Sequence, residues 1–535
     1  MDTSSEIIGK ILYKAGCRRA FGIPGGEVLF LMEGLKKSGI EFFLAKHENC
    51  AGFMAEGGYH ADRAPGILLA TLGPGVANAV NVIANAYQDK IPLIFLTGCV
   101  DENESMKYTH QIFDHSELLK SITKCSIRIV DGEVDTAINK AIAIMYDGQP
   151  GPVHIDVPIG LSSIYQPERE ITLNKFSSSS TPAKGDELDT ARRWFLESEK
   201  PLVIAGVDSL NDRSDKEVAE FVSKYQVPII TTYKAKGILP EDDSLALGGA
   251  GLSPLADKHL LPLVKESDLK ILAGYDPIEM RSGWCNPWNK SERVIEFSSV
   301  TNTHFVHQSS LSFVCNVGEG LRSLSDGITA KKIWQNERPK KIRKKLKSIF
   351  SSNELWGPAA IIDVVRSYLP REGVATVDSG AHRILLNQIW ECYEARSLLQ
   401  STGLCTMGCA VPLAIGFKLK KLHSPVVAFV GDAGMEMVLG ELATLRDLKL
   451  PILIVVFVDK SLALIELKQR KINLINQGVE FGSCNFPAIA EALGGFGSWI
   501  ENREDLYKGL QGVFERETFT LLACKIGEKA YDNRF

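Results

Sequence analysis

Short apolar runs alternate with segments of helical periodicity through the first third of the chain. Residues 7–15 carry apolar side chains at helical spacing, and so does AGFMAEGGYHADR, residues 51–63. The strand-like runs, in chain order, are CRRAFGIPGG, FFLAKHE, GILLATLGPG, IPLIFLTG and PGPVHIDVPIG. Strands that alternate with helices in this way predict a parallel sheet covered on both faces.

The same alternation recurs twice. Strand-like PLVIAGVDSL, VPIITTY and LKILAGYD enclose helical VAEFVSKY, and a later group contains GVATVDSG, MGCAVPLAIGFKL, SPVVAFVGDAG and PILIVVFVDK. The fold class predicted is α/β, with three doubly wound parallel-sheet domains at residues 1–170, 186–325 and 355–535. The length of 535 residues agrees with three domains of about 100–200 residues each.

Two polar segments separate these domains. SSSSTPAKGD, residues 177–186, is small and turn-rich and predicts a linker. KKIWQNERPKKIRKKLK, residues 331–347, is basic but short, and it predicts a solvated connecting helix rather than a nucleic acid-binding surface.

Composition narrows the class of protein. Charged residues make up 23% and hydrophobic residues 45% of the chain, as in ordinary globular proteins. A net charge of -5 gives no reason to expect a nucleic acid or membrane partner. The first residues lack the apolar core of a secretory signal, and the eleven scattered cysteines predict buried, reduced thiols. We therefore expect a cytoplasmic protein.

Two carboxylates stand at the ends of strands predicted in the third domain. PVVAFVGDAG ends in Asp432 among small residues, and PILIVVFVDK ends in Asp459. Small residues before a helix allow a phosphate to approach backbone N–H groups. A carboxylate at that point repels the phosphate unless a cation lies between them, which favours a divalent metal with oxygen ligands. A Gly-Asp at a strand end can also be an ordinary turn, and the second carboxylate is what favours a metal.

The segment GDAGMEMVLGELATLRDLKLPILIVVFVDKSLAL resembles the thiamine diphosphate signature of the acetolactate synthase and 2-oxoacid decarboxylase superfamily. The family signature begins Gly-Asp-Gly and ends Asn-Asn, whereas this chain has Ala433 and Asp459 at the two altered positions. The resemblance implies thiamine diphosphate and Mg²⁺ as cofactors, with Asp432, Asp459 and the main-chain oxygen of Ser461 as metal ligands.

The resemblance extends along the whole chain and gives the three domains their roles: pyrimidine-binding, central and diphosphate-binding. VDSGAH looks like the family's diphosphate-contacting turn, and STGLCTMGCAVPLAIG like the segment beneath the bent cofactor. FGIPGGE and LGPGVAN look like active-site loops. The cofactor-binding residues implied are Gly25, Gly26, Gly73, Asn78, Gly380, His382, Met407, Gly431, Ala433, Gly434 and Leu464.

Glu48 follows a strand-like run and begins a helical one, where a glutamate commonly caps the helix or faces its dipole. By resemblance, Glu48 is the catalytic acid that hydrogen-bonds the aminopyrimidine ring and makes the cofactor reactive. In this family the glutamate domain of one subunit faces the diphosphate domain of its partner, so the resemblance implies a homodimer or a dimer of dimers.

The reaction implied is that of a carboligase: it decarboxylates a 2-oxoacid such as pyruvate and adds the resulting enamine to a second carbonyl. The alternative is a simple 2-oxoacid decarboxylase that releases an aldehyde, and a non-catalytic binding protein is a third possibility. LALIELKQRK lacks the tryptophan that helps acetolactate synthases choose their acceptor. His110, Gln111, Phe113, Asp114 and Leu467 are the predicted substrate residues, with an ordinary surface position as the alternative for the polar ones. Whether the central domain binds FAD, another nucleotide or neither is left open by GVDSLN and GYDPIEMRSGW.

Overall fold

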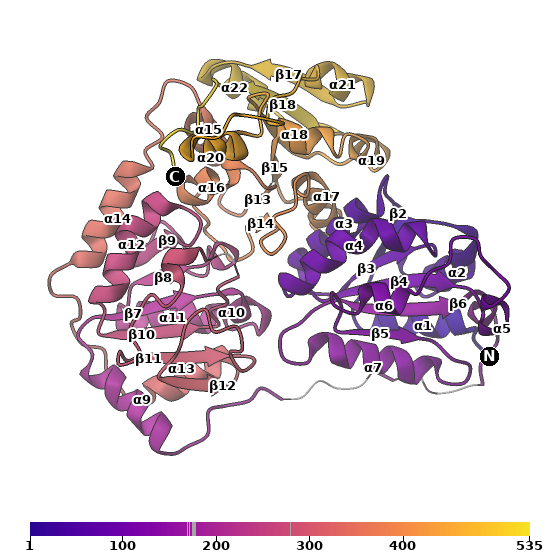
Figure 1. Cartoon of the computed structure of the whole chain (residues 1–535), viewed down its shortest axis with the longest axis horizontal. Coiled ribbons are helices and arrows are strands. Elements are labelled where there is room, and N and C mark those ends of the chain that lie inside the picture. The colour runs from indigo at the N-terminus through magenta and orange to yellow at the C-terminus, as the bar shows by residue number, and fades with distance from the viewer. Residues whose placement is uncertain (168–169, 171, 174–177, 279) are drawn as a thin grey trace.

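The computed structural model describes residues 1–167, 170, 172–173, 178–278 and 280–535. It contains three separate six-stranded sheets, and every strand pair within them is parallel. Helices lie on both faces of each sheet (Figure 1). The predicted fold class is therefore confirmed.

The N-terminal sheet has the strand order β2-β1-β3-β4-β6-β5. Its strands are β1 (Arg19–Ile23), β2 (Glu41–Leu44), β3 (Gly66–Ala70), β4 (Leu93–Cys99), β5 (Cys125–Arg128) and β6 (Val153–Pro158). Its helices are α1 (Ser4–Lys14), α2 (Leu29–Lys37), α3 (Glu48–Asp62), α4 (Pro74–Gln88), α5 (Glu102–Ser105), α6 (His115–Leu119), α7 (Val134–Tyr146) and α8 (Ile159–Ser162). Every residue of β3 and β4 is buried, which explains why these central strands read as uninterrupted apolar runs.

The central sheet has a different order, β12-β11-β10-β7-β8-β9. Its strands are β7 (Pro201–Ala205), β8 (Ile229–Thr231), β9 (Ala246–Gly249), β10 (Leu269–Ala273), β11 (Val294–Ser298) and β12 (Leu311–Val314). Its helices are α9 (Asp186–Glu197), α10 (Val207–Asn211), α11 (Asp215–Tyr225), α12 (Pro254–Glu266) and α13 (Val317–Ser325). When the six strands are numbered along this domain, the order is 6-5-4-1-2-3, which is the strand order of many dinucleotide-binding domains.

The C-terminal sheet has the order β14-β13-β15-β16-β18-β17. Its strands are β13 (Val374–Val377), β14 (Leu398–Gln400), β15 (Val426–Gly431), β16 (Leu453–Val458), β17 (Phe496–Ile500) and β18 (Thr520–Lys525). Its helices are α15 (Pro358–Tyr368), α16 (Ala381–Ile389), α17 (Ala410–Lys420), α18 (Asp432–Glu436), α19 (Glu441–Asp447), α20 (Ala463–Lys471), α21 (Phe486–Ala492) and α22 (Arg503–Leu510). When the strands of each domain are numbered from one to six, the N-terminal and C-terminal sheets both have the order 2-1-3-4-6-5.

The segments between domains differ in kind. Residues 178–185 contain neither helix nor strand, as expected of a linker, whereas Ser177 lies outside the described residues. The basic segment forms α14 (Arg338–Ile349), which buries Pro339, Ile342 and Leu346 against the central domain and leaves its lysines exposed. The charged run is thus the solvated face of a packed helix.

One expected helix is divided. MEMVLGELATLRDL predicts a continuous helix, but α18 ends at Glu436 and α19 begins at Glu441. Between them the backbone forms tighter bonds three residues apart, from Glu441 N to Val438 O and from Leu442 N to Leu439 O. Gly440 lies against the Lys46 side chain of the N-terminal domain, so a tertiary contact accompanies the break.

Candidate active site

Glu48 is the first residue of α3, and its side chain is buried. The helix begins there because His47 is extended and its Nδ1 accepts the N–H of Asn49 at 3.1 Å. Asn78 on α4 donates its side-chain amide to Glu48 Oε2 at 3.0 Å. The structure therefore brings together two residues that were assigned separately, the catalytic acid and a cofactor-binding asparagine.

Two glycine turns lie beside this acid. A Cβ atom at Gly75 would stand 3.5 Å from Glu48 Oε1, so the start of α4 lies against the carboxyl group. The turn at Gly25 lies against Thr71, whose hydroxyl donates to Glu27 Oε2 at 2.5 Å. A Cβ at Gly26 would meet no atom within 4 Å, and this glycine therefore borders open space.

Four of the five predicted substrate residues, all except Leu467, lie in the loop before α6. A cavity of about 510 Å³ is lined by Gln111, Phe113 and Asp114, together with Leu72 and the strand-end Cys99. Asp114 also caps α6, because its side chain accepts the N–H of Glu117 at 2.9 Å. His110 is exposed and is not part of the cavity lining.

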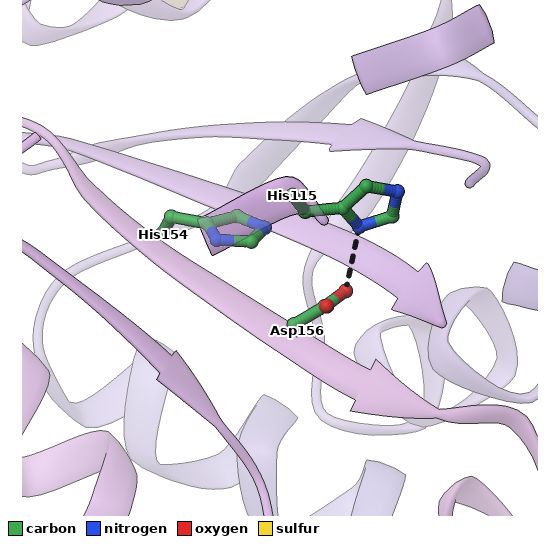
Figure 2. Close-up of side chains that lie close together, drawn as sticks. All are labelled: His115, His154 and Asp156. Atoms are coloured by element: carbon green, nitrogen blue, oxygen red, sulfur yellow. Dashed lines mark hydrogen bonds and ion pairs between the residues drawn. The ribbon is translucent and has the colours of Figure 1, made fainter. Parts of the chain in front are cut away.

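His115 lies in the same lining, one residue beyond the predicted set. Figure 2 shows its imidazole pointing to Asp156, with His154 nearby on the same strand as Asp156. His115 Nδ1 lies 3.2 Å from Asp156 Oδ1, and its Nε2 accepts the N–H of Gly73 at 3.3 Å. This histidine thus connects the sheet to the glycine turn beside Glu48.

The two strand-end carboxylates of the C-terminal domain are neighbours. Strands β15 and β16 pair directly, with Gly431 opposite Phe457, so Asp432 and Asp459 follow at the same edge. Asp432 Oδ2 accepts the N–H groups of Asp459 at 3.1 Å and Lys460 at 2.7 Å.

The electrostatics of this pair favour a cation. Burial raises the pKa of Asp432. Burial and, second, the charge of Asp432 raise the pKa of Asp459 to about 7. A divalent ion with oxygen ligands would relieve both the repulsion and the lost hydration. The donor set present therefore fits a hard metal ion, and substituting aspartate for the family's asparagine preserves an oxygen ligand.

The turn after β13 packs directly beneath these carboxylates. Asp378 is buried and accepts the N–H groups of Gly408 at 2.7 Å and Gly431 at 3.2 Å, while His382 Nε2 lies 2.8 Å from its Oδ1. A Cβ at Gly434 would overlap the Asp378 carboxylate. Asp378 thereby ties together three segments that carry predicted cofactor residues.

The remaining predicted residues of this domain surround the same edge. Gly380 precedes α16, and a Cβ there would collide with the His382 ring. The N–H of Ala433 donates to Asp432 Oδ1 at 2.9 Å. Met407 is half-buried next to Gly408. The N–H of Ser461 donates to Asp459 Oδ1 at 3.2 Å, and its hydroxyl is buried without a partner.

Leu464 and Leu467 follow on α20 and differ in exposure. Leu467 is buried, whereas Leu464 is half-buried and packs at the edge of the apolar core. Leu464 is therefore the more accessible of the two towards the strand-end edge.

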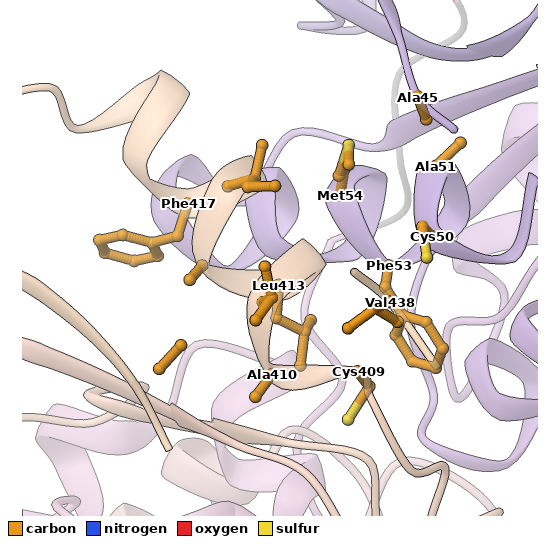
Figure 3. Packing of buried hydrophobic residues seen from close by; sticks show 14 of the residues in the cluster. Ala45, Cys50, Ala51, Phe53, Met54, Cys409, Ala410, Leu413, Phe417 and Val438 are labelled. Carbon is orange, nitrogen blue, oxygen red and sulfur yellow. The ribbon is translucent and has the colours of Figure 1, made fainter. Parts of the chain in front are cut away.

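Helices α3 and α17 pack the N-terminal domain against the C-terminal domain (Figure 3). Phe53 and Met54 on α3 belong to one buried cluster with Leu413 on α17. Glycines permit the close approach, because a Cβ at Gly416 would overlap the Met54 carbonyl. Nearby, Thr406 Oγ1 donates to Asn81 Oδ1 of α4 at 2.9 Å, so the Met407 turn also touches the N-terminal domain.

The corresponding edge of the central sheet is closely packed at two glycines. A Cβ at Gly206 would overlap the Gly274 carbonyl, and one at Gly274 would overlap the Ser209 N–H. Burial raises the pKa of Asp208 to about 7 and also raises that of Asp276. These buried carboxyl groups follow β7 and β10, at the edge where a dinucleotide's pyrophosphate usually approaches.

Four residues of the site were not predicted from the sequence: Glu27, His115, Asp156 and Asp378. Asp378 offered a signal, since it stands at a strand end beside the recognised turn, as Asp432 does. His115 and Asp156 are far apart in sequence, and only the folded chain brings them together. In the described part of the chain, no helix has the length and apolar character needed to cross a bilayer.

Comparison with known proteins identifies the family. Models described as thiamine pyrophosphate enzyme domains match residues 2–118 (N-terminal TPP binding domain), 188–324 (central domain) and 378–524 (C-terminal TPP binding domain). The chain is 28% identical over 519 residues to an acetolactate synthase of Bacillus subtilis, covering 94% of this chain and 89% of that protein. It is 28% identical over 550 residues to the acetolactate synthase isozyme 1 large subunit of Escherichia coli, covering 99% and 95%.

These matches span all three sheets, and the two terminal ones include Glu48 and the Asp432–Asp459 pair. The chain therefore belongs to the thiamine pyrophosphate enzymes and is similar to acetolactate synthases along nearly its whole length.

Proposed function

We propose that the protein is a thiamine diphosphate-dependent carboligase of the acetolactate synthase type. It would decarboxylate a 2-oxoacid such as pyruvate and join the remaining acyl unit to a second carbonyl. The observation that carries this proposal is the pair Asp432–Asp459 at one sheet edge and the buried, hydrogen-bonded Glu48 at another, in a chain that aligns with acetolactate synthases. In this assignment residues 1–170 bind the pyrimidine, 186–325 form the central domain, and 355–535 bind the diphosphate.

The C-terminal domain would hold the charged end of the cofactor. Asp432, Asp459 and the main-chain oxygen of Ser461 would bind Mg²⁺, and the small residues from Gly431 to Gly434 would let a diphosphate approach the backbone. Gly380 and His382 would border the same diphosphate, whereas Met407 and Leu464 would support the rings.

The N-terminal domain would supply the acid. When bound, thiamine diphosphate supplies a carbon nucleophile and accepts the electrons released by decarboxylation. Glu48, buried and oriented by Asn78, would exchange a proton with the aminopyrimidine nitrogen. Gly25, Gly26 and Gly73 would allow backbone to lie close to the ligand.

The substrate would enter beside the cavity lined by Gln111, Phe113 and Asp114. Leu467 and the exposed His110 are assigned to the acceptor region by resemblance alone. The cavity combines an aromatic ring with polar groups, which suits a small carbonyl compound with a carboxylate.

Product analysis tests the proposal. Purified protein with pyruvate, Mg²⁺ and thiamine diphosphate should release carbon dioxide and form a coupled hydroxyacid. Aldehyde without a coupled product would instead assign a simple decarboxylase, and no turnover of any 2-oxoacid or aldehyde pair would overturn both assignments.

We also propose that the protein works as a homodimer or dimer of dimers, with each active site shared between subunits. Glu48→Gln and Asp432→Ala chains can be mixed, dissociated and reassociated. If the two halves of a site come from different subunits, a mixed dimer regains one intact site, and about a quarter of the wild-type activity should return. If both halves come from one subunit, no activity should return.

For the central domain we propose that no dinucleotide is bound, because the buried carboxyl groups of Asp208 and Asp276 follow its strand ends, where a pyrophosphate would approach. The visible absorbance spectrum of purified protein tests this, since bound flavin would give a yellow protein. None of the eleven cysteines, which all lie in the described part of the chain, forms a disulfide, and this supports the proposed cytoplasmic location.

A further inference from the structure

Two imidazoles and a carboxylate gather at the carboxyl edge of the N-terminal sheet. The side chains of His115, His154 and Asp156 have ligand-type atoms within 4.8 Å of one another (Figure 2). Such a set can bind a transition metal only if each atom facing the ion offers a lone pair. The hydrogen bonds around the three residues decide whether it does.

Asp156 fixes the direction of these hydrogen bonds. Burial alone would raise the pKa of Asp156, but the hydrogen bonds from His115 and Thr97 act against burial, and the pKa is lowered. The carboxylate is therefore ionised at neutral pH and can only accept hydrogens. Thr97 Oγ1, at 2.7 Å, must donate its hydroxyl hydrogen to Asp156 Oδ1.

The proton positions on His154 follow. The only hydroxyl hydrogen of Thr97 is donated to Asp156. Thr97 Oγ1 therefore acts as the acceptor in its 2.7 Å contact with His154 Nε2, which carries the hydrogen. Burial lowers the pKa of His154 to about 4, and the ring is neutral. Its Nδ1 then has a lone pair that accepts the Ser126 hydroxyl at 2.6 Å.

His115 is the next member of this chain of hydrogen bonds, beyond Asp156. Its Nδ1, 3.2 Å from Asp156, must carry a hydrogen, because the carboxylate has none to give. Its Nε2 retains the lone pair and accepts the backbone N–H of Gly73. Both nitrogens that face Asp156 and Thr97 thus carry hydrogens, and the group forms a directed hydrogen-bonded chain rather than a metal site.

The end of this chain holds a turn that matters for the proposed reaction. Gly73 has a left-handed backbone, φ +64, and precedes the first residue of α4. Two residues later Gly75 lies against Glu48, and Asn78 on the same helix donates to that glutamate. The Gly73 N–H is buried, so losing its acceptor would loosen the turn.

We propose that His115 is a positioning residue. Held by Asp156 as the neutral Nδ1–H tautomer, it fixes the Gly73 turn and, through α4, the orientation of Glu48. The effect on Glu48 rests on the proposed function of that residue. The hydrogen bond from Gly73 to His115, which we call the tether, does not depend on it.

Two substitutions separate the two bonds of His115. In His115→Gln, the amide oxygen can reach the Nε2 position and accept from Gly73. In His115→Asn, the shorter amide can donate to Asp156 but cannot reach Gly73. The exposed His423, before β15, provides a control in His423→Asn.

The first measurement needs no cofactor. Amide hydrogen exchange of residues 72–77 in the cofactor-free protein should be about fivefold faster in His115→Asn than in wild type. His115→Gln and His423→Asn should match wild type. Wild-type protection in His115→Asn, or equal loss in both variants, would overturn the tether.

The second measurement tests whether the proton exchange proposed for Glu48 depends on His115. With bound thiamine diphosphate and Mg²⁺, deuterium exchange at the cofactor C2 position should slow about tenfold in His115→Asn and stay near wild type in His115→Gln. If amide protection is lost in His115→Asn but C2 exchange is not slowed, His115 stabilises only the Gly73 turn. That outcome would overturn its proposed link to Glu48. If the wild-type protein itself showed no C2 exchange, the proposed function would fail while the amide data still decided the tether.

Discussion

The N-terminal and C-terminal domains share one topology but carry different chemistry at their strand ends. Each sheet has the order 2-1-3-4-6-5 when its strands are counted along the unit. In the C-terminal domain, strands three and four lead into Asp432 and Asp459. In the N-terminal domain the corresponding positions, directly after β3 and β4, are Thr71 and Val100. One edge is therefore built for a cation and the other is not.

The difference shows how the two tasks of the site are divided. Topology decides where a ligand can approach, because parallel strands end at a common edge with helix N-termini around it. The residue types at that edge decide what is held there. The C-terminal edge gathers carboxylates beneath small residues, whereas the N-terminal domain contributes one buried acid, Glu48, at the start of α3.

Removing the carboxylate that distinguishes the C-terminal edge should have the largest effect. Asp432→Ala leaves the metal with one carboxylate, so affinity for Mg²⁺ and thiamine diphosphate should fall together, by at least about 100-fold, and activity with it. Titration calorimetry of the cofactor-free protein measures this. Asp447→Ala, at an exposed carboxylate ending α19, is the matched control. Unchanged affinity in Asp432→Ala would place the metal elsewhere.

Neutralising the acid of the N-terminal edge should separate chemistry from binding. Glu48→Gln preserves shape and the bond to Asn78 but removes the proton exchange, so kcat should fall about 100-fold or more while cofactor affinity changes little. Steady-state kinetics with calorimetry measure both quantities. Glu33→Gln, on the exposed face of α2, serves as control, and near-normal turnover in Glu48→Gln would refute the assignment.

Two glycines, one after β15 and one after β3, should respond unequally to a methyl group. Gly434→Ala would drive a Cβ into the Asp378 carboxylate, whereas the nearest atom to a Cβ at Gly75 is the Ala70 Cβ at 3.1 Å. Gly434→Ala should lower the free energy of unfolding by about 1–3 kcal/mol, and Gly75→Ala by less. Thermal or denaturant unfolding measures this, and equal losses would contradict the contrast in packing.

The smallest expected effect is on the pH dependence of the unfolding free energy, and it concerns Glu56 on α3. Burial raises the pKa of Glu56 on α3 to about 7, partly offset by the charge of Lys234. A carboxyl group with a raised pKa stabilises the fold fully below its unfolded pKa of 4.5, and that contribution is lost as pH rises through 7.

Glu56→Gln carries no such titration. Between pH 5 and pH 8 the wild type should lose about 1 kcal/mol more of its unfolding free energy than this variant does. Denaturant unfolding at the two pH values tests the difference. Parallel pH profiles would show that Glu56 remains ionised throughout, held by Lys234.

The arrangement of strands along the chain could be predicted where apolar runs were continuous. Strands β3, β4, β15 and β16 are buried on both faces, so their sequences mark them without reference to partners. The half-exposed β17 and the short β14 have no such run and were not predicted. The break between α18 and α19 also escaped prediction, because an isolated glycine such as Gly440 is often tolerated inside a helix, and its packing against Lys46 is a tertiary contact.

By itself, the sequence determined which strand ends carry unusual residues. A carboxylate directly after an apolar strand must emerge at the sheet edge, so the apolar runs marked Asp432 and Asp459 as carboxylates that would meet if their strands were neighbours. The structure pairs those strands, β15 and β16. Tertiary structure alone decided the hydrogen-bonded chain from His154 through Asp156 and His115 to Gly73. Its members come from β6, α6 and the turn before α4, and no local pattern encodes contacts between segments that meet only when strands three, four and six lie side by side.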